Sequence, residues 1–218
     1  MVSIVVLVHN ALPYVWRTFR SLAITTGVSY EVVAVDNRSR LLTRLLLIYL
    51  FFARRINRLC LLDSNTLYAQ GNNIGAAASS RDAAYVLLLN SDIEVRDPLW
   101  LQKLLALHKR GATAYGVAAG DRVLPERADG FCFLIDRDLY LKYELDEQFE
   151  WWWSLTKLQA TLLKDGLTVT AVRKHEDQLH HFGGKSGKAW RGARGMDTTR
   201  DAVREWFDGR RVAVVERI

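Results

Sequence analysis

The chain has 218 residues, with 30 Lys and Arg against 24 Asp and Glu, and a formal net charge of +6. Half of the residues are hydrophobic and only 3 are Pro, a composition that excludes collagen, a coiled coil, a disulfide scaffold and general disorder. The length predicts one domain with a single core. The modest positive charge favours an anionic small molecule as partner, and because no nucleic-acid-binding motif is present, we expect no nucleic acid.

Three features of the sequence bear on the compartment of the protein. Residues 1–8 run directly into a strand pattern without a basic leader, so we expect no signal peptide. Cys60 and Cys132 lie in apolar runs and are typical of buried thiols in a reducing compartment. The longest apolar run, residues 45–53, is too short to span a membrane and is either a core helix or a helix that docks on a membrane surface. We therefore expect a cytoplasmic protein, with peripheral membrane contact left open.

Strands and helices alternate along the first half of the chain. We predict strands at 3–8, 31–35, 58–62 and 85–89, and helices at 13–23, 39–53 and 72–80. Strands this uniformly apolar are covered on both faces, as in a parallel sheet. The order predicts an α/β protein with a doubly wound, mostly parallel sheet flanked by helices, whose ligands bind beyond the carboxyl ends of the strands.

The second half is less regular. We predict helices at 99–109, 151–164 and 198–207 and strands at 130–135, 167–172 and 211–215, with a loop rich in Gly and Lys at 183–188. We expect residues 1–187 to form the domain. Residues 188–218 are expected to form a C-terminal tail with a short helix that packs on it.

Polar side chains cluster where the first, second and fourth predicted strands end. His9 and Asn10 follow the first strand, Asp36 and Asn37 the second, and residues 90–92 (Asn-Ser-Asp) the fourth. Because the carboxyl ends of parallel strands meet at one edge of a sheet, we expect these side chains to face a common ligand site.

Five segments, in this order, resemble the motifs of family 2 glycosyltransferases with the GT-A fold. They are residues 2–10 with 33–39, 71–75, 87–92, 128–130 leading to 145–149, and 181–186. The resemblance covers residues 2–187. It implies a single GT-A domain that transfers a sugar from a nucleotide-diphosphate donor to an acceptor hydroxyl of a glycan or glycoconjugate, with inversion.

The resemblance also implies which residues bind the donor. Asp36 would contact its base or ribose. Beside the resemblance, the six basic residues within 173–195, among them Lys185, are typical of a loop that covers a diphosphate. Other interpretations stay open, because Asp36, His9 and Asn10 are also common turn or cap residues and the loop is also typical of a solvated surface. The donor-binding candidates are His9, Asn10, Asp36, Asn73, Asn90, Ser91 and Lys185.

The resemblance further implies a divalent metal at the diphosphate. The family places a D-x-D motif after the fourth strand, and here only its last carboxylate is present, Asp92. One carboxylate with phosphate oxygens and waters suits Mn²⁺ or Mg²⁺, which keep several ligands from outside the protein. His181, in the pattern H-x-G-G-x-S, is the second metal candidate, with a structural histidine as the alternative.

The sequence departs from the family at the general base. An inverting transfer needs a carboxylate that accepts the proton of the acceptor hydroxyl, and the family has acids at the positions that Ser154 and Leu155 occupy here. Three explanations are open. Glu150, Glu147 or Asp146 supplies the base, or Leu155 is a substitution at the catalytic position, or the protein binds a donor without efficient turnover.

Other functions stay open. A donor-binding pseudoenzyme would explain the missing acids, and the short length, which leaves little room for an acceptor domain, would fit a module of a larger glycosyltransferase. A nucleotidyltransferase would need a glycine-rich basic loop after the first strand, and residues 10–13 (Asn-Ala-Leu-Pro) argue against one.

Overall fold

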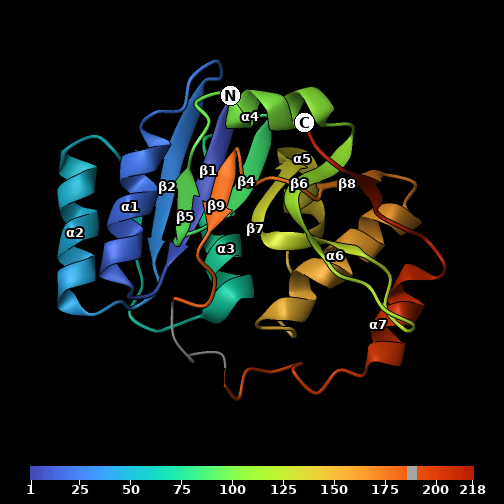
Figure 1. Cartoon of the computed structure of the whole chain (residues 1–218). Coiled ribbons are helices and arrows are strands. Elements are labelled where there is room, and N and C mark those ends of the chain that lie inside the picture. The colour runs from blue at the N-terminus through green and yellow to red at the C-terminus, as the bar shows by residue number, and fades with distance from the viewer. Residues whose placement is uncertain (186–190) are drawn as a thin grey trace.

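The computed structural model describes residues 1–185 and 191–218, which form a sheet with helices on both faces (Figure 1). The strands of the main sheet follow the order β10-β8-β6-β7-β4-β1-β2-β3. Their bounds are β1 Val2–Val8, β2 Tyr30–Asp36, β3 Arg58–Leu61, β4 Tyr85–Asn90, β6 Gly111–Ala118, β7 Arg127–Asp136, β8 Thr168–Val172 and β10 Ala213–Val215. Two short strands, β5 Ile93–Val95 and β9 Leu179–His181, form a separate antiparallel pair.

The helices divide between the two faces of the main sheet. One core contains side chains of α1 Leu12–Leu22, α2 Leu41–Phe52 and α4 Trp100–Leu107. The other contains side chains of α3 Leu67–Ala77, α5 Arg137–Tyr143, α6 Trp152–Lys164 and α7 Arg200–Phe207. The central strand β1 serves both, because alternate side chains of a strand point to opposite faces: Ile4 and Val6 pack into the first core and Val5 into the second.

The predicted fold class is confirmed. Strand β7 runs antiparallel to both β4 and β6, and the other neighbouring pairs of the main sheet are parallel. Because β7 is reversed, its first residues, rather than its last, lie at the edge of the sheet where the parallel strands end. This reversal decides which side chains reach the site.

Some elements differ from the sequence prediction. Helix α3 begins at Leu67, five residues before the predicted start at 72, and neither β6 nor α5 was predicted. Strand β6 is built largely of Gly and Ala, which have low strand propensity, so only its buried place between β7 and β8 makes it a strand.

Within residues 188–218, α7 packs against α6, and β10 pairs with β8 at the edge of the main sheet. Ser186 and Lys188 of the basic loop lie outside the described residues.

Two glycines let α3 approach the sheet closely. A Cβ atom on Gly75 would lie 2.3 Å from Val5 Cγ1, and one on Gly71 would lie 2.5 Å from Leu7 Cδ1. The helix therefore rests directly on β1, with its N-terminal end at the carboxyl edge of the sheet. No helix in the described ranges is long and apolar enough to cross a membrane.

Candidate active site

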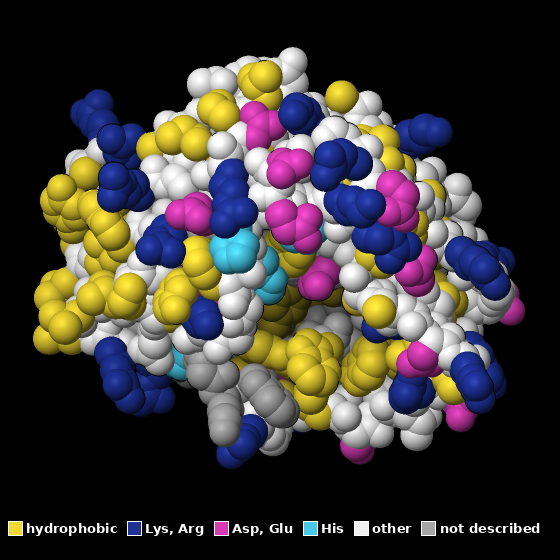
Figure 2. Space-filling model, in the orientation of Figure 1, with side chains coloured by type: hydrophobic (Ala, Val, Ile, Leu, Met, Phe, Trp, Pro, Cys, Tyr) yellow, Lys and Arg dark blue, Asp and Glu magenta, His cyan; other side chains and the backbone are white. Residues whose placement is uncertain are grey.

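A cavity of about 550 Å³ opens beyond the carboxyl ends of β1 and β4. Figure 2 shows the hollow near the centre of the face, with His, Asp and Glu side chains beside it. The polar and aromatic residues that line it are His9, Asn37, Asn65, Tyr68, Asn90, Ser91, Asp92, Arg127, Asp129, Phe131, Trp151, Trp152, Trp153, Thr156, Gln159, His181 and Lys185. A cavity of this size, with apolar walls and a few polar groups, is typical of a small-molecule site.

The two metal candidates lie side by side in this cavity. Asp92 directly precedes β5 and His181 ends β9, and the pairing of Ile93 with His181 brings the two side chains together. His181 Nε2 lies 3.3 Å from Asp92 Oδ1 and 3.3 Å from Asn90 Nδ2. The Phe131 ring stacks on the imidazole with ring centroids 4.6 Å apart, which fixes its plane.

This donor set fits a divalent ion that takes most of its ligands from elsewhere. Among the described residues no group of three or more His, Cys, Asp and Glu side chains could enclose a metal. Asp92 and His181 offer one carboxylate oxygen and one imidazole nitrogen. His181 Nε2 cannot both accept from the Asn90 amide and donate to Asp92, whereas a cation would be attracted by the carboxylate and the imidazole lone pair together. Mn²⁺ and Mg²⁺ both accept such a partial site when phosphate oxygens and waters complete it.

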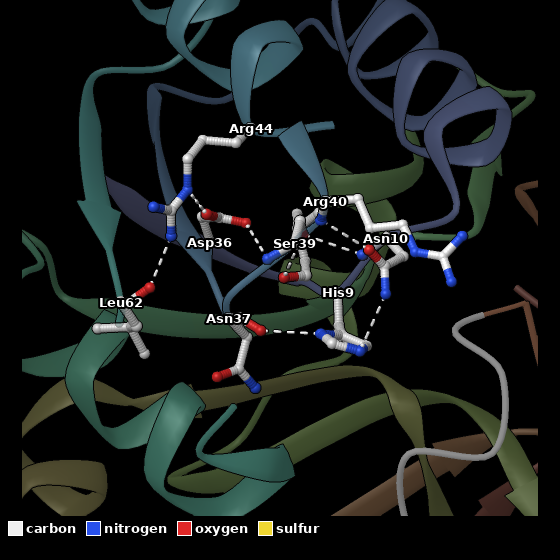
Figure 3. A network of polar contacts seen from close by, with 9 residues as sticks. His9, Asn10, Asp36, Asn37, Ser39, Arg40, Arg44 and Leu62 are labelled. Carbon is white, nitrogen blue, oxygen red and sulfur yellow. Dashed lines mark hydrogen bonds and ion pairs between the residues drawn. The ribbon is translucent and has the colours of Figure 1, made fainter. Parts of the chain in front are cut away.

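Residues after β1 and β2 form a hydrogen-bonded rim on one side of the cavity (Figure 3). His9 Nδ1 donates to Asn37 O at 2.8 Å, and His9 Nε2 accepts from Asn10 Nδ2 at 3.0 Å. Asn10 Oδ1 in turn accepts from Arg40 N at 2.8 Å, and Asn10 N donates to Ser39 Oγ at 2.9 Å. His9 and Asn37 line the cavity, while Asn10 ties the two loops together behind them.

Asp36 is fully buried at the end of β2 and does not line the cavity. Its Oδ1 accepts from Ser39 N at 3.0 Å, and its Oδ2 lies 2.6 Å from Arg44 Nε (Figure 3). Arg44 also donates to Leu62 O at 2.6 Å. Asp36 therefore caps the loop after β2 and holds the side chain of Arg44 in place.

Asn37 shapes the next segment of the rim. Its Oδ1 accepts from Thr66 N at 2.7 Å, and its Nδ2 donates to Leu67 O at 3.2 Å. These bonds hold Leu67 at φ 59°, a left-handed conformation that costs a non-glycine residue about 1–2 kcal/mol. Asn10 and Ala11 are left-handed too, so strained backbone gathers around the cavity, as at many functional sites.

Asn73 lies on α3, away from the cavity. Its Nδ2 donates to Leu145 O at 2.9 Å, and its Oδ1 accepts from Leu145 N and from the Tyr140 hydroxyl at 3.0 and 2.9 Å. A fully bonded amide of this kind joins α3 to the loop after α5.

The three carboxylates expected to supply the base do not line the cavity. Asp146 lies 2.6 Å from Lys157 Nζ, and Glu147 accepts from Gln70 Nε2 at 3.1 Å. Burial opposes ionisation of Asp146, but Lys157 and the backbone N–H of Gln148 outweigh it and lower the pKa of Asp146. A carboxylate held in this way is a weaker base.

Glu150 holds two segments together. Its carboxylate accepts from the backbone N of Arg194 at 2.7 Å and from Arg194 Nε at 2.9 Å, and these bonds lower its pKa. Its backbone oxygen accepts from Tyr68 N and Ala69 N at the start of α3.

Asp129 is a cavity carboxylate that the sequence analysis did not single out. It lies on β7, is half-buried, and its Oδ1 accepts from Gly130 N at 2.6 Å. Gln159 holds the preceding residue, Ala128, through both its N–H and its C=O. In the sequence, residues 128–130 stand out only as part of the resemblance to the family. The antiparallel direction of β7, which brings its first residues to the site, is not visible in the sequence.

Leu155 and Ser154 stand where the resemblance implies acids. One lines the cavity and the other is buried. Leu155 lines the cavity, and its Cδ2 would lie 3.0 Å from a Cβ on Gly130. Ser154 is fully buried and donates to Trp151 O at 2.9 Å. All three residues at 151–153 line the cavity, and the indole nitrogen of Trp153 is buried without a hydrogen-bond partner in the described chain.

The remaining donor candidates also line the cavity. Ser91 lies between Asn90 and Asp92, and its backbone oxygen accepts from Thr18 Oγ1 at 2.9 Å. Lys185 is exposed, with its Nζ 5.4 Å from the centre of the Tyr14 ring. The structure thus brings together His9, Asn90, Ser91, Asp92, His181 and Lys185.

Comparison with known proteins gives the class to which this fold and site belong. The sequence matches glycosyl transferase family 2 over residues 3–170, so the chain belongs to that family. No protein of curated function gives a significant sequence match.

Solved structures support the GT-A fold. S. aureus TarS 1–349 has a TM-score of 0.58 and 14% identity over 73% of this chain and 54% of that one. Its complex with UDP has a TM-score of 0.57 and 16% identity over 73% of this chain and 55% of that one. GalNAc-T7 with UDP, GalNAc and Mn²⁺ has a TM-score of 0.56 and 15% identity over 70% of this chain and 38% of that one. The chain therefore spans about half the length of the TarS 1–349 structures.

Proposed function

We propose that the cavity binds a nucleoside diphosphate sugar together with Mn²⁺ or Mg²⁺, and that the sugar passes with inversion to a hydroxyl of a glycan or glycoconjugate. The observation that carries this proposal is the contact between Asp92 and His181 inside the cavity of a family 2 chain. TarS is described in complexes with UDP and UDP-GlcNAc and GalNAc-T7 with UDP and Mn²⁺, so UDP and Mn²⁺ are the first ligands to try.

The chain's own residues would hold the donor in a defined orientation. Asp92 and His181 would bind the metal, which when present neutralises the charge that builds on the distal phosphate as the sugar leaves. Lys185 would add positive charge beside the diphosphate, while Asn90 and Ser91 would contact it. His9 would face the nucleoside, and Asn10, Asp36 and Asn73 would act through the loops that they fix.

Asp129 is the residue that we propose as the general base. Asp92 and Asp129 are the two carboxylates among the described residues that line the cavity, and Asp92 is assigned to the metal. In this scheme the acceptor oxygen attacks the anomeric carbon, its proton passes to Asp129, and the nucleoside diphosphate leaves with the electrons of the broken bond. Glu150, Glu147 and Asp146 are the alternative bases, although each is bonded to protein groups outside the cavity.

Thermal unfolding with UDP and Mn²⁺ tests the donor and metal parts of the proposal. We expect UDP with Mn²⁺ to raise the Tm more than either alone, because a ligand that binds only the folded state stabilises it. Asp92→Asn should remove the Mn²⁺-dependent part. Asp82→Asn is the matched control, since Asp82 is an exposed carboxylate before β4, at the opposite edge of the sheet. If UDP, GDP and dTDP, each with Mn²⁺, leave the Tm unchanged, the proposal is wrong.

A second candidate is a donor-binding protein without turnover. It is favoured by the apolar side chain of Leu155 at the cavity wall, where the family carries an acid. Leu155→Asp separates the two candidates in an assay of UDP release from a panel of UDP-sugars. If the wild type releases no UDP and Leu155→Asp does, the pseudoenzyme is favoured. UDP release by the wild type that is lost when Asp129 is replaced would exclude the pseudoenzyme.

A further inference from the structure

Helix α2 is apolar on both its inner and its outer face. Its inner side chains, such as Leu47 and Leu50, are 0% and 3% exposed and pack into the core. Five outer side chains are exposed by 49–78%; they are Leu41, Leu42, Leu45, Tyr49 and Phe52. The spacing of 41, 45, 49 and 52 places four of them along one side of the helix.

This outer stripe has no cover in the described part of the chain. A helix that is apolar all round is normally buried in a core, but α2 lies at the end of the molecule beside β3, the edge strand of the main sheet (Figure 1). Figure 2 shows apolar side chains gathered at the left of the same view, with Lys and Arg side chains around them. Single exposed apolar residues are ordinary, but a continuous stripe of Leu, Tyr and Phe indicates a binding surface.

Unpaired arginines flank both ends of the helix. Residues 37–62 contain six Arg and no Asp or Glu. Two of these Arg form ion pairs inside the protein, Arg44 with Asp36 and Arg58 with Glu31. The other four are exposed and have no ion pair within the described residues; they are Arg38, Arg40, Arg54 and Arg55.

We propose that α2 docks the protein in the plane of an anionic lipid bilayer. Leu, Tyr and Phe side chains of an in-plane helix enter the boundary between headgroups and acyl chains, while flanking Arg residues bind lipid phosphates. A second copy of this chain is a poorer occupant, because a symmetric contact would bring the same unpaired arginines against each other. The Arg40 N bond to Asn10 Oδ1 also places the start of α2 at the cavity edge of the sheet.

Cosedimentation with large unilamellar vesicles tests the proposal without any assay of sugar transfer. We expect the full chain to bind vesicles of phosphatidylcholine with about 30 mol% phosphatidylglycerol, and to bind pure phosphatidylcholine at least tenfold more weakly. High salt should weaken the binding to anionic vesicles.

Two variants test the two kinds of contact. Tyr49→Ser with Phe52→Ser should weaken binding at least tenfold. Arg54→Gln with Arg55→Gln should weaken it about fivefold for each Arg removed. Leu141→Ser and Arg204→Gln, at exposed positions on α5 and α7, are the matched controls and should bind as the wild type does. Unchanged Tm values would exclude unfolding as the cause.

Three results would overturn the proposal. The first is no binding to anionic vesicles. The second is equal binding by the wild type and both α2 variants. The third is a concentration-dependent dimer that Phe52→Ser abolishes, without vesicle binding, which would make the outer face of α2 an interface between copies.

Discussion

Neighbouring side chains decide what each carboxylate around the site can do. Asp92 and Asp129 line the cavity, whereas Asp146 and Glu150 are held by Lys157 and Arg194. The sequence predicted a base near residues 146–150 from position along the chain. It could not reveal the partners of those acids, since the partner of Glu150 is 44 residues away in the sequence.

The proposed base gives a prediction at the same scale. Asp129→Asn keeps the size and the bond to Gly130 but removes the proton acceptor, so we expect turnover of the best UDP-sugar to fall about 10²–10⁴-fold. Binding of UDP and Mn²⁺, measured by calorimetry, should change little.

Glu150→Gln is the comparison for this variant, because Glu150 is one of the three acids that the sequence offers as the base. If Asp129 is the base, Glu150→Gln should lower turnover far less than Asp129→Asn. A large loss with Glu150→Gln and full activity with Asp129→Asn would reverse the assignment.

Among the elements, the parallel strands on the first half of the chain and most of the helices were predictable, whereas β5, β6, β9, α5 and the start of α3 were not. Strands β1, β2 and β4 are largely apolar because both faces are covered, and that pattern is visible in the sequence. The early start of α3 depends on the left-handed Leu67 and its bond to Asn37, which lies 30 residues away. The reversed direction of β7 follows from pairing with β4 and β6, which local pattern does not encode.

The contact between α3 and β1 gives a prediction for the stability of the site. Gly75→Val would place side-chain atoms inside the space of Val5 and Val35, so we expect a loss of about 2–3 kcal/mol in the free energy of unfolding. Ala77→Val adds the same β-branched side chain at an exposed position of the same helix and should change stability by under about 1 kcal/mol. Urea denaturation measures both, and equal losses would mean that α3 does not rest on β1 as described.

Glu31 ties three strands of the sheet together and should make stability depend on pH. It is buried on β2, accepts from Ser3 of β1 and from Ser80 N at 2.6 Å, and pairs with Arg58 of β3 at 3.2 Å. Burial opposes its ionisation, but these bonds outweigh it and lower its pKa. A lowered folded-state pKa means that the stabilisation is complete above the unfolded-state pKa and is lost as the pH falls through the folded-state value.

We therefore expect Glu31→Gln to destabilise the protein by about 1–3 kcal/mol at pH 7 and by less at pH 4. Urea denaturation of wild type and variant at both values measures the difference. A gap that stays constant, or that widens at pH 4, would contradict this role for Glu31.

At the scale of the whole molecule, the family and the sheet class were visible in the sequence, and the extent of the folded unit was harder to read. The motifs lie in residues 2–187, and the family match covers 3–170. Residues beyond the match nevertheless contribute β10 to the main sheet and α7 to the core, through Val203 and Phe207. These short segments carry no motif, and their place is set by the sheet edge and helix that they cover.

The central claim is that Asp92 and His181 hold a divalent ion at the diphosphate of the donor. A crystal grown with UDP and MnCl₂, with anomalous diffraction recorded at the manganese edge, tests it most directly. We predict one anomalous peak in contact with an oxygen of Asp92, with Nε2 of His181 and with the diphosphate. A diphosphate bound in the cavity with no peak at this pair, or a peak that persists unchanged in Asp92→Asn, would contradict the account.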